Sequence, residues 1–317
     1  SAQAKATQTG IEFDLDIAPH LPTVWGDRTH LEQVFVNLIG NAIKFSPDGG
    51  TIVFVSDRSG DENLYLMDAD GSDVQRLTDA PGYDGGPFFS ADGSRITWRR
   101  FSLDGSKAEI YSMDLASREE KQLTRMGVMS WAPYFHPSGD YLIFATNKQG
   151  FANFELYLVD AAGEHEPVRV TYTDGFDGLP VFSPDGRWLA YESDESGRPE
   201  IYVRPFPGPG GKWQVSDGGG TWPSWSPDGK YIANATGDIL FLIDAKTLEV
   251  LDAETMPKLN ETHDAIFTPD SKYIIATSRT KSVFPDCKTP EKPADGEWRM
   301  DGQLKLYDVA AKQFVGK

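Results

Sequence analysis

A five-residue segment that recurs six times is the feature of this sequence that most restricts its fold. Successive copies lie 42 to 47 residues apart, and they begin at Phe45, Phe89, Phe135, Phe182, Trp225 and Phe267. The first copy reads Phe45-Ser46-Pro47-Asp48-Gly49. An aromatic residue can end a strand, proline fixes φ for a turn, and Asp-Gly supplies a side-chain acceptor and a positive φ. Each copy therefore predicts a hairpin turn, which we call the marker turn.

Segments with strand character follow each marker turn. An alternating or apolar segment comes first, as in residues 51–55 or 188–191, and a second follows, as in residues 64–68. A closing segment then ends in a hydroxyl residue, as in Gln122-Leu123-Thr124. With the strand before the turn, this makes four strands in a repeat of roughly 40 to 45 residues, which is typical of a propeller blade. Six copies predict an all-β fold, a six-bladed β-propeller of four-stranded antiparallel blades.

The repeats resemble those of TolB-like, WD-related β-propellers over residues 41–317, which we take as one domain. The resemblance implies a scaffold that binds a protein or peptide partner at the mouth of its central channel. It also implies a periplasmic or cell-envelope location, although no signal peptide is visible in the sequence. The sequence gives no indication of oligomeric state.

Charge and composition exclude several classes of partner. The formal net charge is −18 and no stripe of Lys and Arg occurs, so nucleic acid is not an expected partner. No apolar run approaches the roughly 20 residues that span a bilayer, so membrane insertion is not expected either. Cys287 is the single cysteine, and an intramolecular disulfide is therefore impossible.

Residues 1–40 differ in kind from the repeats. A predicted strand at residues 11–17 precedes an amphipathic helical pattern whose N-cap is Asp27. Residues 26–47 resemble the N-box of sensor histidine kinases. That resemblance implies a magnesium ligand at Asn41, with Asn37 and Lys44 beside nucleotide phosphates and Glu32 one turn before Asn37. The Gly-rich nucleotide segments and the phosphoacceptor histidine of those kinases are missing, so we predict no kinase or ATPase activity and regard residues 1–40 as a cap or fusion segment.

The join between the two parts is ambiguous. Residues 41–45 can end the kinase-like helix or form the innermost strand of the first blade, but they cannot do both completely. If the first blade is complete, the helix is expected to stop near Ile39 or Gly40, because glycine often ends a helix.

The loops that lead into the innermost strands are the predicted binding site, because they surround the channel mouth. Aromatic anchors with a few charges are typical of protein-recognition surfaces. The candidates are Tyr83, Asp84, Ser130, Trp131, Phe176, Asp177, Thr221, Trp222, Thr262, His263 and Asp264. The alternative is that many of them only pack neighbouring blades together.

No catalytic constellation, cofactor site or metal site is predicted. Residues 68–73 have the alternating carboxylates of a calcium loop, but the distal Glu is absent and the repeat requires a hairpin turn there. The histidines His20, His30, His136, His165 and His263 show no metal-ligand spacing. One enzymatic alternative stays open, a metal-dependent lyase or lactonase site formed by Asp84, Asp177, His263 and Asp264 at the mouth.

The sixth repeat carries one long insertion, from Arg279 to Gly302. It is rich in Lys, Pro and Asp and contains Cys287 and Trp298. By its place in the repeat it is expected to overhang the mouth, where it is either functional or disordered.

Overall fold

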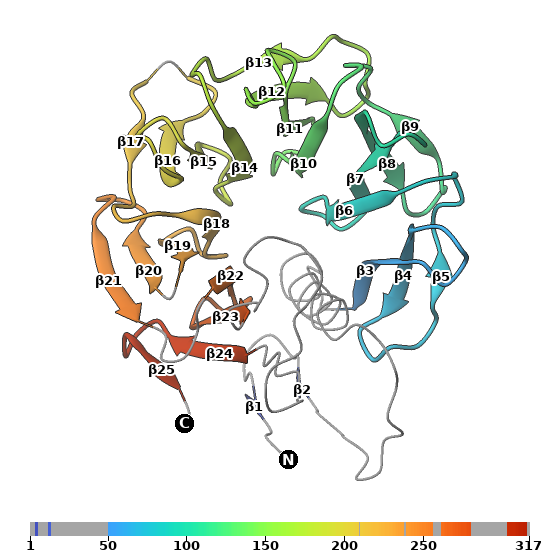
Figure 1. Ribbon diagram of the computed structural model, residues 1–317. Coiled ribbons are helices and arrows are strands. Elements are labelled where there is room, and N and C mark those ends of the chain that lie inside the picture. The colour runs from blue at the N-terminus through green and yellow to red at the C-terminus, as the bar shows by residue number, and fades with distance from the viewer. Residues whose placement is uncertain are drawn as a thin grey trace, which may run out of the picture.

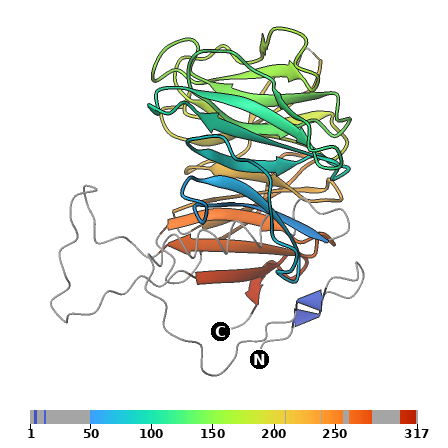
Figure 2. The ribbon, with the colours of Figure 1, turned by 90° about the vertical axis from the view of Figure 1, so that its right-hand side faces the viewer.

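The marker repeats correspond to blades arranged around a central axis (Figure 1). The fold is taken from a computed structural model, which describes residues 4–5, 12–13, 50–208, 210–237, 239–255, 261–279 and 303–315. These residues contain no helix and form six sheets around the ring, beside a small two-stranded sheet of β1 (Ala4–Lys5) and β2 (Glu12–Phe13). The prediction of an all-β, six-bladed propeller is confirmed. Figure 2 shows the same blades from the side.

Each blade is an antiparallel sheet whose strands follow chain order from the axis to the rim. Blade one has three described strands, β3 (Thr51–Ser56), β4 (Asn63–Asp68) and β5 (Gln75–Arg76). The four strands of blade two are β6 (Asp84–Phe89), β7 (Arg95–Phe101), β8 (Ala108–Asp114) and β9 (Glu120–Gln122). Those of blade three are β10 (Ser130–Phe135), β11 (Tyr141–Thr146), β12 (Glu155–Asp160) and β13 (Val168–Arg169).

The remaining blades repeat this order. Blade four consists of β14 (Asp177–Phe182), β15 (Trp188–Ser193), β16 (Glu200–Pro205) and β17 (Trp213–Gln214). Blade five consists of β18 (Thr221–Trp225), β19 (Tyr231–Thr236), β20 (Ile239–Asp244) and β21 (Val250–Thr255). Blade six consists of β22 (Glu261–Phe267), β23 (Tyr273–Arg279), β24 (Gln303–Asp308) and β25 (Gln313–Val315).

Side chains within each marker turn close it. In blade four, Ser183 Oγ donates to Asp185 Oδ1 at 2.6 Å, and the Arg187 N–H donates to the same carboxylate oxygen at 3.0 Å. Blades two, five and six repeat this pattern with Asp92, Asp228 and Asp270. The hydrogen bond from Ser90 is the main reason that the pKa of Asp92 falls to about 2. The recurrence of Ser and Asp in the marker turns is therefore explained by the hydrogen bonds that these side chains make within the turn.

Neighbouring marker turns are also bonded to each other. Arg95 Nη2 of blade two donates to the Gly139 carbonyl of blade three at 2.6 Å. In blade three His136 stands in the serine position, and its Nδ1 accepts from the Ser138 N–H. The His136 proton is therefore on Nε2, which lies 3.0 Å from the Gly186 carbonyl of blade four. These contacts link successive blades on the face that carries the marker turns.

A hydroxyl group fastens the outer strand in four of the blades. Thr124, which follows β9, accepts the Ile110 N–H at 2.9 Å and donates to Glu109 Oε2 at 2.6 Å. Thr78, Thr171 and Ser216 accept the equivalent N–H groups in blades one, three and four. The predicted closing segments thus end in a hydroxyl because the third strand needs an acceptor at that point.

We expect Thr124→Val to lower the free energy of unfolding by about 1–3 kcal/mol, because valine keeps the shape but leaves the buried Ile110 N–H unpaired and removes one of the hydrogen bonds to Glu109 Oε2. Urea denaturation measures this loss. Thr124→Ser keeps the hydroxyl and serves as the matched control. Equal stability of the valine and serine variants would show that the hydroxyl does not fasten the strand.

The core lies between blades. Each large cluster of buried apolar residues combines side chains from two neighbouring blades, as when Ile143 of β11 packs with Leu189 of β15. Tyr134 of β10 packs against three such clusters, and burial raises its pKa to about 12. Inner-strand side chains therefore occupy part of the space around the axis.

Three predictions fall outside the described residues. The kinase-like segment, including Glu32, Asn37, Asn41 and Lys44, lies there, so its role as a cap and the domain boundary at residue 40 stay predictions. The inner strand of blade one and the insertion from residue 280 to 302 also lie there. Residues 69–74 are described, and they form the turn between β4 and β5, where Ser72 donates its N–H to Asp70.

Candidate functional site

One face of the ring gathers the loops that lead into the inner strands and the loops that join the second and third strands of each blade. The antiparallel register places them together, because Asp84 at the start of β6 pairs with Arg100 near the end of β7, and Arg100 pairs with Glu109 near the start of β8. We call this the mouth face. The marker turns lie at the opposite end of each sheet.

A strained bulge interrupts the inner strands near the mouth face. The register shifts after Gly85, Trp131, Gly178 and Thr221. At each shift one residue has a positive φ, namely 63° at Gly86, 47° at Ala132, 51° at Leu179 and 52° at Trp222. Non-glycine residues rarely adopt a positive φ. Such a conformation persists only where the surrounding structure enforces it, and it is common at binding sites. A bulge also changes the direction in which the bulged residue's side chain points.

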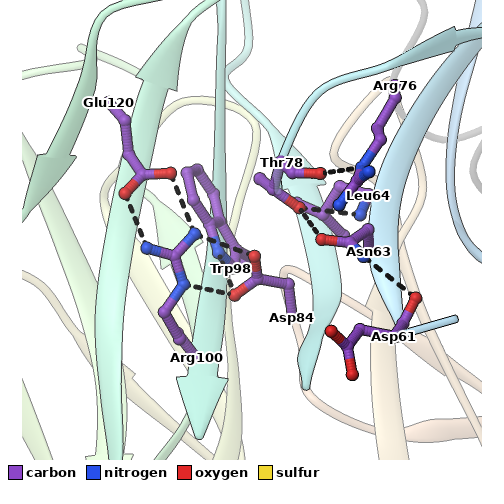
Figure 3. A network of polar contacts seen from close by, with 9 residues as sticks. All are labelled: Asp61, Asn63, Leu64, Arg76, Thr78, Asp84, Trp98, Arg100 and Glu120. Carbon is purple, nitrogen blue, oxygen red and sulfur yellow. Dashed lines mark hydrogen bonds and ion pairs between the residues drawn. The ribbon is translucent and has the colours of Figure 1, made fainter. Parts of the chain in front are cut away.

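Asp84 belongs to a buried ion-pair network within blade two, formed by residues of β6, β7 and β9 (Figure 3). Its side chain is 1% exposed and accepts from Arg100 Nε at 2.6 Å, Arg100 Nη2 at 2.8 Å and Trp98 Nε1 at 3.1 Å. Arg100 also binds Glu120 at 2.6 Å. Burial by itself lowers the pKa of Arg100, but hydrogen bonds and the charges of both carboxylates outweigh burial and raise it. The Asp84 carboxylate is therefore fully engaged inside the fold.

Tyr83, next to Asp84, packs against neighbouring side chains. Its ring lies 5.3 Å from that of Phe101, and the Arg99 guanidinium lies 5.6 Å from its centre. A Cβ at Gly85 would lie 2.1 Å from the Tyr83 hydroxyl, so a larger residue there would displace the Tyr83 ring.

An aromatic row joins blades three and four. The Trp131 ring lies 4.8 Å from Phe154, and Phe154 lies 5.7 Å from Phe176. Ser130 is buried beside Trp131. Asp177 is 1% exposed, and its Oδ2 accepts from Thr173 at 2.6 Å. The structure therefore brings four predicted residues together at one junction, where they lie mostly inside the fold.

Trp222 is the one predicted aromatic residue with a largely exposed side chain among those that the structure describes, at 40%. It occupies the bulge of β18, and the neighbouring Thr221 donates from Oγ1 to the Ala235 carbonyl at 2.9 Å. Thr262, His263 and Asp264 lie in β22, where the register shifts between Thr262 and Asp264. The side chains of those three residues are outside the described part.

Three exposed apolar residues on the mouth face were missed in the sequence. Phe151 is 92% exposed and Leu103 80%, both in loops that join second and third strands, and Tyr172 is 72% exposed in the loop into β14. Each interrupts a polar turn segment, as in Gln149-Gly150-Phe151. An apolar residue at the tip of such a turn is the signal that could have identified them.

The chemistry of the described residues gives no metal centre. No group of three His, Cys, Asp or Glu side chains suited to a metal occurs among them. Asp84 and Asp177 begin β6 and β14, and the blade containing β10 separates these strands. The structure does not bring these two carboxylates of the enzymatic alternative together.

Comparison with known sequences identifies relatives that share this repeat. The family described as TolB beta propeller domain matches residues 86–284. A protein TolB homolog of Chlorobium chlorochromatii is 31% identical over 173 residues, which cover 53% of this chain and 38% of that protein. The uncharacterized peptidase YuxL of Bacillus subtilis is 32% identical over 168 residues, covering 50% of this chain and 23% of that protein. The matches thus span well under half the length of these relatives.

Solved structures share the fold. TolB from Acinetobacter baumannii superposes with a TM-score of 0.61 at 21% identity, covering 84% of this chain and 63% of that one. An oligogalacturonate lyase from Vibrio parahaemolyticus has a TM-score of 0.61 at 16% identity, covering 86% and 75%. At such identities the likeness supports the fold alone.

Proposed function

The chain belongs to the TolB β-propeller domain family, and from that premise we propose that it is a non-catalytic scaffold that binds a protein or peptide partner at its mouth face. The observation that carries the proposal is the set of exposed apolar side chains there. Leu103, Phe151, Tyr172 and Trp222 come from loops and strands of blades two to five, yet all lie on this one face. Exposed apolar side chains grouped on a polar surface mark interaction sites.

The charges around these residues favour a partner with basic groups. The described loops of the mouth face carry nine acidic and five basic side chains. Complementary charge speeds encounter and disfavours the wrong partners. An extended peptide with apolar anchors and basic residues fits this face best.

We further propose that the protein acts in the bacterial cell envelope or periplasm, as the family resemblance suggests. In the part of the chain that the structure describes, no helix has the length and apolar character to cross a membrane. A metal-dependent lyase is the weaker candidate, because Asp84 is engaged by Arg100 and lies apart from Asp177.

The test is selection of a displayed random-peptide library on the immobilised propeller, followed by affinity measurements on variants. We expect Trp222→Ala and Phe151→Ala each to weaken the selected peptides by about tenfold or more, because aromatic anchors dominate such interfaces. Trp213→Ala is the matched control. Trp213 is 44% exposed, close to the value of Trp222, but it lies on the rim strand β17. Peptides that bind all three variants equally well would refute the proposal.

A further inference from the structure

Blades two and four begin with similar local sequences, but the carboxylate of the first residue has different surroundings in the two blades. Asp84-Gly85-Gly86-Pro87 and Asp177-Gly178-Leu179-Pro180 open β6 and β14, and both Asp side chains are 1% exposed. Each Asp has a cross-strand partner on the second strand of its blade. For Asp84 that partner is Arg100, whereas for Asp177 it is Ser193.

The cation of blade two therefore has no counterpart at the same position in blade four. In blade two both oxygens of Asp84 are bound by Arg100. In blade four Thr173 binds Asp177 Oδ2, while Oδ1 has no hydrogen-bond partner among the described residues. An ionised carboxylate at this depth is costly without a cation or a donor on each oxygen.

A second carboxylate at the same junction is also incompletely bound. Glu155 opens β12 and is fully buried. Its Oε1 pairs with Arg169 at 2.5 Å, whereas its Oε2 has no hydrogen-bond partner among the described residues. A parallel bridge joins Phe154 to Phe176, the residues directly before Glu155 and Asp177. The two carboxylates thus start strands that meet at the junction of blades three and four.

The other described cations around this junction are engaged elsewhere. Lys212 pairs with Glu195, Arg198 pairs with Glu200 at 2.6 Å, and Arg204 donates to the Val170 carbonyl at 2.9 Å. None of these interactions involves Asp177.

The aromatic walls that accompany the cation in blade two are kept in blade four. The Arg100 guanidinium lies 4.4 Å from the ring centre of Tyr111 and 5.7 Å from that of Trp98. The corresponding register positions in blade four hold Tyr202 and Tyr191, a cross-strand pair whose rings are 6.0 Å apart, and Lys212 Nζ lies 5.5 Å from the ring centre of Tyr202. Aromatic faces attract guanidinium groups.

We propose that Asp177, with Glu155, forms a site for a guanidinium group, supplied by an arginine side chain of the bound partner. A planar guanidinium can bind a carboxylate through two parallel N–H bonds, as Arg100 binds Asp84, which an ammonium cannot do. That the guanidinium comes from a partner's arginine rests on the proposed function. That the site binds a guanidinium group does not.

The experiment titrates the whole chain with methylguanidinium chloride, at low millimolar concentrations, and follows binding by ligand-observed NMR. Methylammonium chloride and calcium chloride are the comparison ligands. We expect methylguanidinium to bind more tightly than methylammonium, and Asp177→Asn to weaken it by about tenfold or more, because a charge-assisted bond is lost.

Ser193→Arg provides an independent variant, because it recreates the Arg100 arrangement from within the chain. It is expected to abolish methylguanidinium binding and to raise the melting temperature, whereas Ser193→Ala leaves binding intact. If the original chain, Asp177→Asn and Ser193→Arg all bind methylguanidinium with equal affinity, the proposed site is refuted. Calcium binding that excludes methylguanidinium overturns the choice of ligand.

Failure of this site is distinguishable from failure of the proposed function. If Trp222→Ala loses peptide binding but the original chain does not bind methylguanidinium, the proposed scaffold function stands and the guanidinium site is refuted. If the original chain binds methylguanidinium but Trp222→Ala binds peptides unchanged, the guanidinium site stands and peptide binding at the mouth face is refuted.

Discussion

Replacing Arg100 by methionine is expected to lower the free energy of unfolding by about 3–5 kcal/mol, which is the usual cost of leaving a buried charge without its partner. Methionine retains much of the side-chain length but cannot neutralise Asp84, whose oxygens receive two guanidinium hydrogen bonds at 2.6 and 2.8 Å. Glu120 loses its partner as well. Urea denaturation followed by tryptophan fluorescence measures the change.

Arg187→Met is the matched control, because Arg187 pairs with Asp185 at 2.8 Å on the surface. Exposed pairs contribute about 0–1 kcal/mol, so this variant is expected to be nearly as stable as the original chain. Similar losses for both substitutions would mean that burial of the Asp84 network is not the source of the effect.

Glu192→Gln is expected to stabilise the protein above neutral pH and to have little effect in acid. Burial raises the pKa of Glu192 from 4.5 to about 7, the charge of Asp194 adds to the rise, and a hydrogen bond from the Trp222 backbone opposes it. The folded state therefore holds this proton more tightly than the unfolded chain does. Stability falls as the pH rises between 4.5 and about 7.

The size of the Glu192 effect follows from that shift, which corresponds to about 3 kcal/mol once the pH is above 7. Denaturation curves from pH 4 to pH 8 give the difference between the glutamine variant and the original chain. Glu119→Gln, at an exposed hairpin position, controls for the loss of one negative charge. A difference that does not grow with pH would contradict the assignment.

The blades were predictable because their determinants are local. Asp92 and Asp185 bind N–H groups two residues away, and Thr124 meets the third strand of its own blade. Such contacts recur in most of the described blades and are visible as a recurring motif. The position of each blade in the ring then follows from chain order.

The candidate site was less predictable, because its properties depend on register between strands. Asp84 and Asp177 have similar neighbours in sequence, yet one faces Arg100 and the other Ser193. Each partner lies on the following strand, across the hairpin, and not beside the Asp in the sequence. A carboxylate at a loop end therefore could not be identified as ion-paired from the motif alone.

Trp131 and Trp222 show how one residue of spacing decides whether a tryptophan side chain is packed or exposed. In Ser130-Trp131-Ala132-Pro133 the bulge falls on Ala132, and Trp131 packs against Phe154. In Thr221-Trp222-Pro223 the shorter segment puts the tryptophan itself at the bulge, where its side chain is exposed. The number of residues between the tryptophan and the following proline is visible in the sequence, and it distinguishes a packed tryptophan from a candidate anchor.

The bonds between marker turns limit how the repeats can be exchanged during evolution. Gly139 receives its donor from Arg95 of the preceding blade, and the Gly186 carbonyl faces His136 of the blade before it. A duplicated or transplanted blade would bring its own turn but not the donor that the next turn expects. Because the acceptors are backbone carbonyls, which any marker turn can offer, a blade inserted before either glycine would keep the bond only if it carried a donor side chain at the position of Arg95 or His136.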